Sequence, residues 1–170
     1  EGELRRRGMT RPAAALVSRT LVDAGDPGFT DPTKPIGRYL SRAEAQVLID
    51  HGQVWQDRGE KGWRRVVASP EPIEILEAGT IATLVAAGYV VVAAGGGGIP
   101  VTRTVCGEIE GVEAVIDKDL TAAILATTLA ADVLVIATDV ENVMIGWGTP
   151  QQRALGSVTA AELRSYAEAG

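Results

Sequence analysis

The stretch "YVVVAAGGGGIPV", Tyr89 to Val101, joins an apolar strand directly to four consecutive glycines and a proline. A continuous apolar run of this kind is typical of a strand that is covered on both faces of a parallel sheet. Glycine loses more backbone entropy on folding than any other residue, so this run indicates positive φ angles or a very close neighbour. We interpret Gly95, Gly96, Gly97 and Gly98 as a loop that cradles a ligand. A flexible linker is the alternative, but linkers usually have polar flanks.

The glycine run does not match either of the common nucleotide-binding loops. In the dinucleotide fingerprint G-x-G-x-x-G, Pro100 stands where the third glycine is required, and the Gly-Lys pair of the P-loop is absent from the chain. A bound nucleotide therefore requires another architecture.

Apolar strands alternate with helical patterns along the chain. This order predicts parallel βαβ units and an α/β layered sheet. The predicted elements are a strand over 13–22, a helix with Ser41 as N-cap and Gly52 as its stop, a hairpin over 53–67, a helix stopped by Gly88, an alanine-rich helix from Leu120, a fully apolar strand over 132–140, and a final helix opened by a capping box of Thr159 and Glu162.

The length and composition favour one domain with an appendage. The chain has 170 residues, of which 46% are hydrophobic, enough to bury one sizeable core. Residues 31–68 are more polar and richer in turns than the sequence that follows, so we predict a small protruding subdomain or lid there. The opening "EGELRRRGMTRP" has the features of a helix end with Gly8 as its stop, which suggests a chain cut from something longer.

The charge and the cysteine content exclude several classes of function. A net charge of −6 provides no basic field for nucleic acid or for an anionic membrane surface. No apolar run reaches the roughly 20 residues of a membrane-spanning helix. The single cysteine, Cys106, cannot form an intrachain disulfide or a metal-thiolate cluster, so we expect a reducing, cytoplasmic setting.

Three charged residues mark the predicted start of the alanine-rich helix. Lys118 stands between Asp117 and Asp119 in "VIDKD". Free N–H groups and a partial positive charge at a helix start, together with a lysine, suit phosphate oxygens. Asp119 would then hold Mg²⁺ or order Lys118. The alternative is that Asp119 is only an N-cap and that Lys118 is a solvated side chain.

Two further candidates lie in loops. Lys34, in "PTKPIG", is bracketed by prolines that stiffen the backbone, so it loses less entropy when it grips a ligand. Asp139 lies at the end of the apolar strand predicted over 132–140, and could accept a hydrogen bond from a ribose or adenine donor. An ordinary loop lysine and a turn-initiating aspartate are the respective alternatives.

These motifs occur together in one known family. The segments "DPTKPIG", "GWRRVVASPEP", "AAGGGGIPV", "GVEAVIDKDLTAAILA" and "ATDVENV" closely resemble the carbamate kinases of the amino-acid kinase superfamily, over nearly the whole chain. The resemblance implies a three-layer αβα sandwich with a mostly parallel sheet, a protruding subdomain and a homodimer. It also implies reversible phosphoryl transfer between ATP and carbamate, giving ADP and carbamoyl phosphate, which fermenting microbes use to make ATP from arginine breakdown.

The resemblance also assigns roles to single residues. It makes Lys34 the lysine that reaches the transferred phosphoryl group, Lys118 the lysine that bridges the nucleotide phosphates, and Asp119 the carboxylate that orients the lysines. It makes the glycine run a loop beside the nucleotide, with Mg²⁺ carried by ATP or ADP. The residues that it places around adenosine are Asp139, Val140, Met144 and Trp147.

Two other functions stay open at this stage. Full-length carbamate kinases begin with a strand and a glycine-asparagine loop, and end with a "GSMGPK"-like segment; neither is present in this sequence. The chain could therefore be a non-catalytic fragment that keeps the dimer surface and a weak nucleotide site. It could also be a related kinase with another acidic substrate, such as acetylglutamate or a nucleoside monophosphate.

Overall fold

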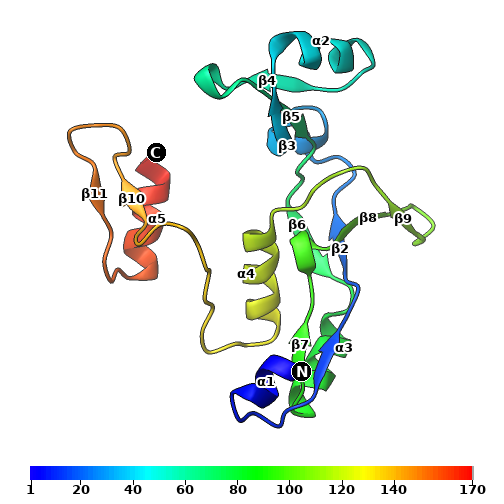
Figure 1. The fold of residues 1–170 in the computed structure, drawn as a ribbon. Helices are drawn as coiled ribbons and strands as arrows, with labels where there is room; N and C mark the ends of the chain where they lie inside the picture. Colours follow the sequence, from blue (N-terminus) through cyan, green and yellow to red (C-terminus); the bar gives the residue numbers. More distant parts are fainter. Residues whose placement is uncertain (170) are drawn as a thin grey trace. The chain divides into compact units, whose positions relative to one another are not determined.

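The computed structural model describes residues 1–169, which fall into two compact units (Figure 1). Unit 1 is Glu1–Leu134 and unit 2 is Val135–Gly170. The elements of unit 1 are α1 (Gly2–Arg6), β1 (Ala13–Ala15), β2 (Arg19–Val22), η1 (Pro27–Phe29), β3 (Lys34–Leu40), α2 (Arg42–Asp50), β4 (Trp55–Asp57), η2 (Gly59–Lys61), β5 (Trp63–Val67), β6 (Pro72–Ile75), α3 (Ala78–Ala86), β7 (Val90–Val92), η3 (Gly95–Gly97), β8 (Ile99–Arg103), β9 (Ile109–Gly111) and α4 (Lys118–Thr128).

Parallel pairing joins strands that are far apart in the sequence. β1 pairs with β7, and β2 pairs with β8. The single strand predicted over 13–22 is therefore two strands, because its halves pair with different partners on either side of the glycine run. β6 and β9 flank the second pair antiparallel, in the order β6-β2-β8-β9. The α/β class is confirmed. Among the described strands, however, antiparallel pairs outnumber parallel ones, whereas a mostly parallel sheet was predicted.

A second sheet in unit 1 is antiparallel, with the order β3-β5-β4. The predicted hairpin is present as β4 and β5. The predicted capping box of α2 is also present, since Ser41 Oγ accepts from the Glu44 backbone N–H at 3.3 Å while Glu44 Oε2 accepts from the Ser41 backbone N–H at 2.9 Å. This sheet and α2 lie within the segment 31–68, whose status as a protruding subdomain stays a prediction.

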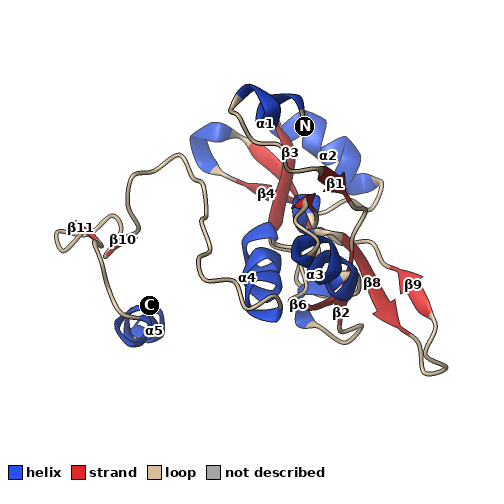
Figure 2. Ribbon diagram, turned by 90° about the horizontal axis from the view of Figure 1, so that it is seen from below, coloured by secondary structure: helices blue, strands red, loops and turns tan. Residues whose placement is uncertain are grey.

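The core of unit 1 lies between the β6-β2-β8-β9 sheet and the helices beside it. α4 packs on β6 of this sheet and on η3 (Figure 2), while α3 packs on β7 of the β1–β7 pair (Figure 1). Ile75 and Ile81 are each 2% exposed and Ile116 is 1% exposed. Two threonines, Thr20 and Thr121, are fully buried in the same core, so their hydroxyl groups need partners inside the protein.

The prediction of an apolar strand over 132–140 is wrong. This segment has no strand, and Val133, Val135 and Ile136 are 74%, 81% and 51% exposed. A strand forms where a neighbouring strand satisfies its backbone N–H and C=O groups. Among the described residues, no strand pairs with this segment, so its β propensity has no partner.

Unit 2 contains a short hairpin and a helix: β10 (Met144–Ile145), β11 (Arg153–Ala154) and α5 (Ala160–Ala169). The predicted capping box of α5 is confirmed, since Thr159 Oγ1 accepts from the Glu162 backbone N–H at 3.2 Å and Glu162 Oε2 accepts from the Thr159 backbone N–H at 2.7 Å. Within residues 1–169, none of the helices combines the length and the apolar character that a bilayer crossing requires.

Candidate functional site

The four-glycine stretch forms the tight turn η3, which follows β7 and precedes β8. Gly96, Gly97 and Gly98 all have positive φ, as does Ala94 just before them. A Cβ atom on Gly97 would lie 2.6 Å from the Ile116 carbonyl oxygen, and one on Gly98 would collide with Thr20 Oγ1. The close neighbour of the second half of the run is therefore the protein itself. Gly95 and Gly96 are exposed, and a Cβ atom on either would meet no other atom within 4 Å, so that half leaves room for a ligand.

The carbonyl oxygen of Gly97 ties three segments together. It accepts hydrogen bonds from Thr20 Oγ1 at 2.7 Å and from Thr121 Oγ1 at 3.1 Å. Thr20 belongs to β2 and Thr121 to α4. The two buried hydroxyl groups thus find their acceptor in the glycine turn, and the turn is held against the first turn of α4.

Asp117 is the N-cap of α4. Its Oδ1 accepts from the backbone N–H groups of Asp119 at 2.9 Å and Leu120 at 3.2 Å. These are two of the N–H groups that an α-helix leaves without partners at its start. The alternative that Asp119 is the N-cap is therefore wrong. Asp119 is the second residue of the helix, and its carboxylate lies 3.4 Å from Lys118 Nζ.

Lys34 reaches the same helix start from the first residue of β3. Its Nζ donates to Asp117 Oδ2 at 2.6 Å, and the two side chains are 29% and 34% exposed. The hydrogen bond from Lys34 is the main cause that lowers the pKa of Asp117; partial burial opposes it, and the two backbone N–H groups reinforce it. One carboxylate oxygen of Asp117 therefore caps the helix, and the other binds Lys34.

The structure thus brings together three of the regions that carry predicted site residues. Lys34 contacts the residue next to Lys118, and the glycine turn packs on Ile116, the residue before Asp117. Lys118 itself is 69% exposed. The prediction missed Asp117 as a site residue, although an aspartate directly before the first helical residue is the ordinary signal of an N-cap.

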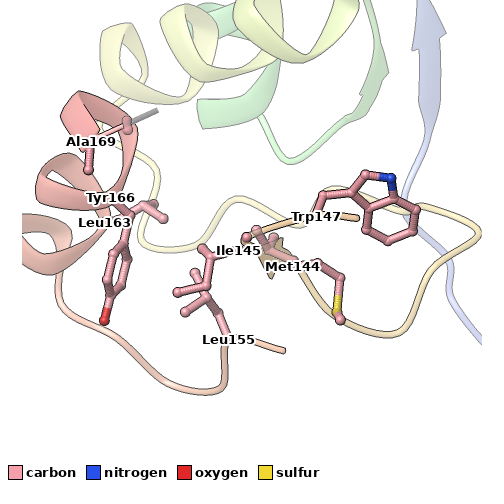
Figure 3. A pocket seen from close by; sticks show the side chains of 10 residues that line it. Met144, Ile145, Trp147, Leu155, Leu163, Tyr166 and Ala169 are labelled. Carbon is pink, nitrogen blue, oxygen red and sulfur yellow. The ribbon is translucent and has the colours of Figure 1, made fainter. Parts of the chain in front are cut away.

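The residues predicted around adenosine lie in unit 2. Asp139 is exposed, and Val140 is 57% exposed. Met144 and Trp147 line an apolar pocket of about 560 Å³ between the β10–β11 hairpin and α5, a volume within the range of small-molecule sites. Figure 3 shows Leu163 and Tyr166 on α5 across from Ile145 and Leu155. Asp139 and Val140 do not line this pocket.

Sequence comparison supports the similarity found in the motifs. The profile of the amino acid kinase family matches residues 33–170. A carbamate kinase-like protein of Escherichia coli K12 is 48% identical over 94% of this chain and 51% of its own length. Carbamate kinase 1 of Enterococcus faecium is 45% identical over 99% of this chain and 53% of its own length. The chain therefore spans about half the length of the curated relatives it matches.

Solved structures agree with the sequence relatives. A Giardia lamblia carbamate kinase bound to citric acid superposes with a TM-score of 0.88 at 38% identity, covering 99% of this chain and 53% of that one. The same enzyme bound to AMP-PNP gives a TM-score of 0.82, covering 99% and 54%. With a family profile that matches most of the chain and relatives well above 30% identity, this protein belongs to the amino acid kinase family.

Proposed function

We propose that this chain is the nucleotide-handling part of a carbamate kinase, which transfers a phosphoryl group reversibly between ATP and carbamate to give ADP and carbamoyl phosphate. The observation that carries the proposal is the 2.6 Å contact between Lys34 and Asp117 at the start of α4, beside the glycine turn. The relatives named carbamate kinase, at 43–46% identity, support the choice of substrate.

The proposed chemistry needs positioning and charge neutralisation rather than a covalent intermediate. Phosphoryl transfer has a loose transition state with negative charge spread over the transferred oxygens. Lys34 would face the transferred phosphoryl group, and Lys118 would bridge the phosphates at a helix start that itself favours anions. Asp119, 3.4 Å from Lys118 Nζ, would hold that ammonium in place.

Asp117 adds a positioning role to this scheme. A lysine side chain has four rotatable bonds, and fixing it costs entropy. The contact with Asp117 Oδ2 holds the Lys34 ammonium at the mouth of α4 before a nucleotide arrives. The incoming phosphate then meets a cation that is already in place, which is the principle of preorganised electrostatic catalysis.

The proposal includes Mg²⁺, carried by the phosphates of ATP or ADP, where it would neutralise charge. Among residues 1–169, no cluster of three or more His, Cys, Asp or Glu side chains is arranged to hold a metal ion. Gly95 and Gly96 would lie beside the nucleotide, and Asp139, Val140, Met144 and Trp147 would surround adenosine. A cytoplasmic homodimer that makes ATP from arginine breakdown completes the proposal.

The test measures binding and chemistry separately. The 170-residue chain is titrated with ADP by calorimetry, and ATP formation from ADP and carbamoyl phosphate is then assayed with Mg²⁺. We expect saturable ADP binding that weakens in Lys118→Gln, because Lys118 would bridge the nucleotide phosphates, and that is unchanged in Arg103→Gln, an exposed control on β8. ADP binding without ATP formation would favour a non-catalytic nucleotide-binding fragment, and the absence of ADP binding would refute the proposal for this chain.

A further inference from the structure

A polar pocket lies on the β3-β5-β4 sheet of unit 1. It has a volume of about 330 Å³ and is lined by Pro35, Tyr39, Arg58, Lys61 and Arg64. Arg64 projects from β5, while Arg58 and Lys61 belong to the β4–β5 connection around η2. Since a water molecule takes up about 30 Å³ in the liquid, the pocket has room for a tetrahedral oxyanion and part of its hydration shell.

Strand register separates this pocket from the Lys34 contact. Tyr39 pairs with Arg64 and Pro35 pairs with Val66, so these residues share one face of the sheet. Side chains alternate along a strand, so Lys34 and Arg65 project from the opposite face. The pocket and the Lys34–Asp117 contact therefore lie on different faces of the same strands.

The three cations around the pocket have no carboxylate partner. Across residues 1–169, the salt bridges within 4.0 Å involve none of Arg58, Lys61 and Arg64. Arg58 Nη2 donates to the neutral Gln56 Oε1 at 2.8 Å. The neighbouring Asp57 instead accepts from the Gly59 backbone N–H at 2.9 Å. In a chain with a net charge of −6, three uncompensated cations around one hollow create a local positive potential that attracts anions.

Arg64 is held in a fixed orientation and has an unused donor. Its guanidinium carbon lies 5.1 Å from the centroid of the Tyr39 ring, a cation–π distance. Its Nε is buried and has no acceptor among the described residues. Because the buried Nε is closed to solvent, an oxyanion in the pocket would be bound through the terminal Nη groups, which can hold two oxygens of one group.

We propose that this pocket binds a small phosphate-bearing anion, held bidentately by Arg64 and neutralised by Arg58 and Lys61. The proposal does not rest on the phosphotransferase activity proposed above. It assigns the β3-β5-β4 sheet a ligand of its own, on the face away from Lys34.

The experiment follows the Nε–Hε signals of Arg58 and Arg64 by ¹⁵N NMR while the chain is titrated with inorganic phosphate. We expect both signals to shift saturably. A parallel titration with glycerol phosphate distinguishes free phosphate from a phosphate monoester as the preferred ligand. Arg64→Lys keeps the charge but loses the two-pronged guanidinium. In this variant the phosphate affinity measured from the Arg58 signal should fall at least about tenfold. Arg65→Lys, one residue along on the other face, is the matched control and should bind like the parent chain.

Every outcome bears on the proposal. Lys34→Gln should leave the phosphate affinity measured from the Arg64 signal unchanged, which separates this pocket from the proposed kinase site. The proposal is overturned if neither signal shifts saturably, or if Arg64→Lys and Arg65→Lys weaken binding equally. Should Arg64→Lys fail to fold by circular dichroism, the double variant Arg58→Gln with Lys61→Gln, at two exposed positions, takes its place. Weaker phosphate binding by that variant supports the pocket, and unchanged binding refutes it.

Discussion

Gly97 in unit 1 lies in a loop that the sequence predicts beside a nucleotide, and Val135 in unit 2 lies in a segment that it predicts as a buried strand, but the surroundings of the two residues differ. Gly97 is buried, and its carbonyl oxygen accepts two hydrogen bonds. Val135 is 81% exposed and lies in no strand. The glycine turn finds its partners, β2 and α4, within unit 1. The apolar segment has the composition of a buried strand and no strand beside it among the described residues.

The difference separates two kinds of sequence signal. A helix cap is satisfied by groups close by in the sequence, such as the N–H groups one turn along the helix. The glycine turn needs partners from distant segments, and it finds Thr20 and Thr121 within unit 1. A buried strand needs a partner from elsewhere in the fold. Among the described residues, the helix caps at Ser41, Asp117 and Thr159 are all satisfied, while the apolar segment over 132–140 has no strand partner.

The largest effect is expected from Gly97→Ala. The residue has a φ of 101°, and its Cβ would lie 2.6 Å from the Ile116 carbonyl oxygen. The strained φ and the overpacking together should lower the free energy of unfolding by about 2–4 kcal/mol, measured by urea denaturation of the 170-residue chain. Gly95→Ala is the control, because nothing lies within 4 Å of its Cβ position. Equal losses in the two variants would show that the turn is not packed as described.

Asp117→Ala should have the next largest effect. It removes the N-cap of α4 and leaves Lys34 without its partner, so we expect a loss of about 1–2 kcal/mol in the free energy of unfolding. Asparagine caps a helix about as well as aspartate, so Asp117→Asn should recover most of this stability. Both variants should weaken ATP binding if Asp117 positions Lys34, because ATP carries the phosphoryl group that Lys34 would face. Full ATP binding by Asp117→Asn would reduce Asp117 to a helix cap.

A smaller effect should appear in the pH dependence of stability. The hydrogen bond from Lys34 lowers the pKa of Asp117 in the folded chain. The stabilisation is therefore complete above the unfolded pKa of about 3.9, and is lost as the pH falls through the lower folded value. In urea denaturation between pH 6 and pH 2, the free energy of unfolding should fall less with decreasing pH in Asp117→Asn than in the parent chain. Identical profiles would contradict the ion pair.

The smallest effect is expected at Val135. Val135→Ala should change the free energy of unfolding by no more than about 0.5 kcal/mol, because the side chain is 81% exposed. The same substitution at Val101, which is 3% exposed in β8, should cost about 1–3 kcal/mol. A large loss at Val135 would mean that the segment is buried in solution and would remove the contrast between the two units.

Much of unit 1 could be predicted from local chemistry. The Ser41 capping box, the hairpin of β4 and β5, and the stop of α3 at Gly88 follow from residues within a few positions of one another. The break between β1 and β2 could not be predicted, because it depends on which distant strand each half joins. In the candidate site, the meeting of Lys34 with the start of α4 was predicted through the resemblance. The specific partner, Asp117, was missed because a two-residue shift of the helix start, from Leu120 to Lys118, decides which aspartate is the cap.

The Gly97 carbonyl also has a consequence for motion. Because Thr20 and Thr121 share this one acceptor, β2, the glycine turn and the first turn of α4 are linked at a single atom. A displacement of α4 on ligand binding would have to break one of these contacts or carry β2 along. Amide hydrogen exchange in the three segments should therefore slow together on ligand binding, as in one cooperative opening unit.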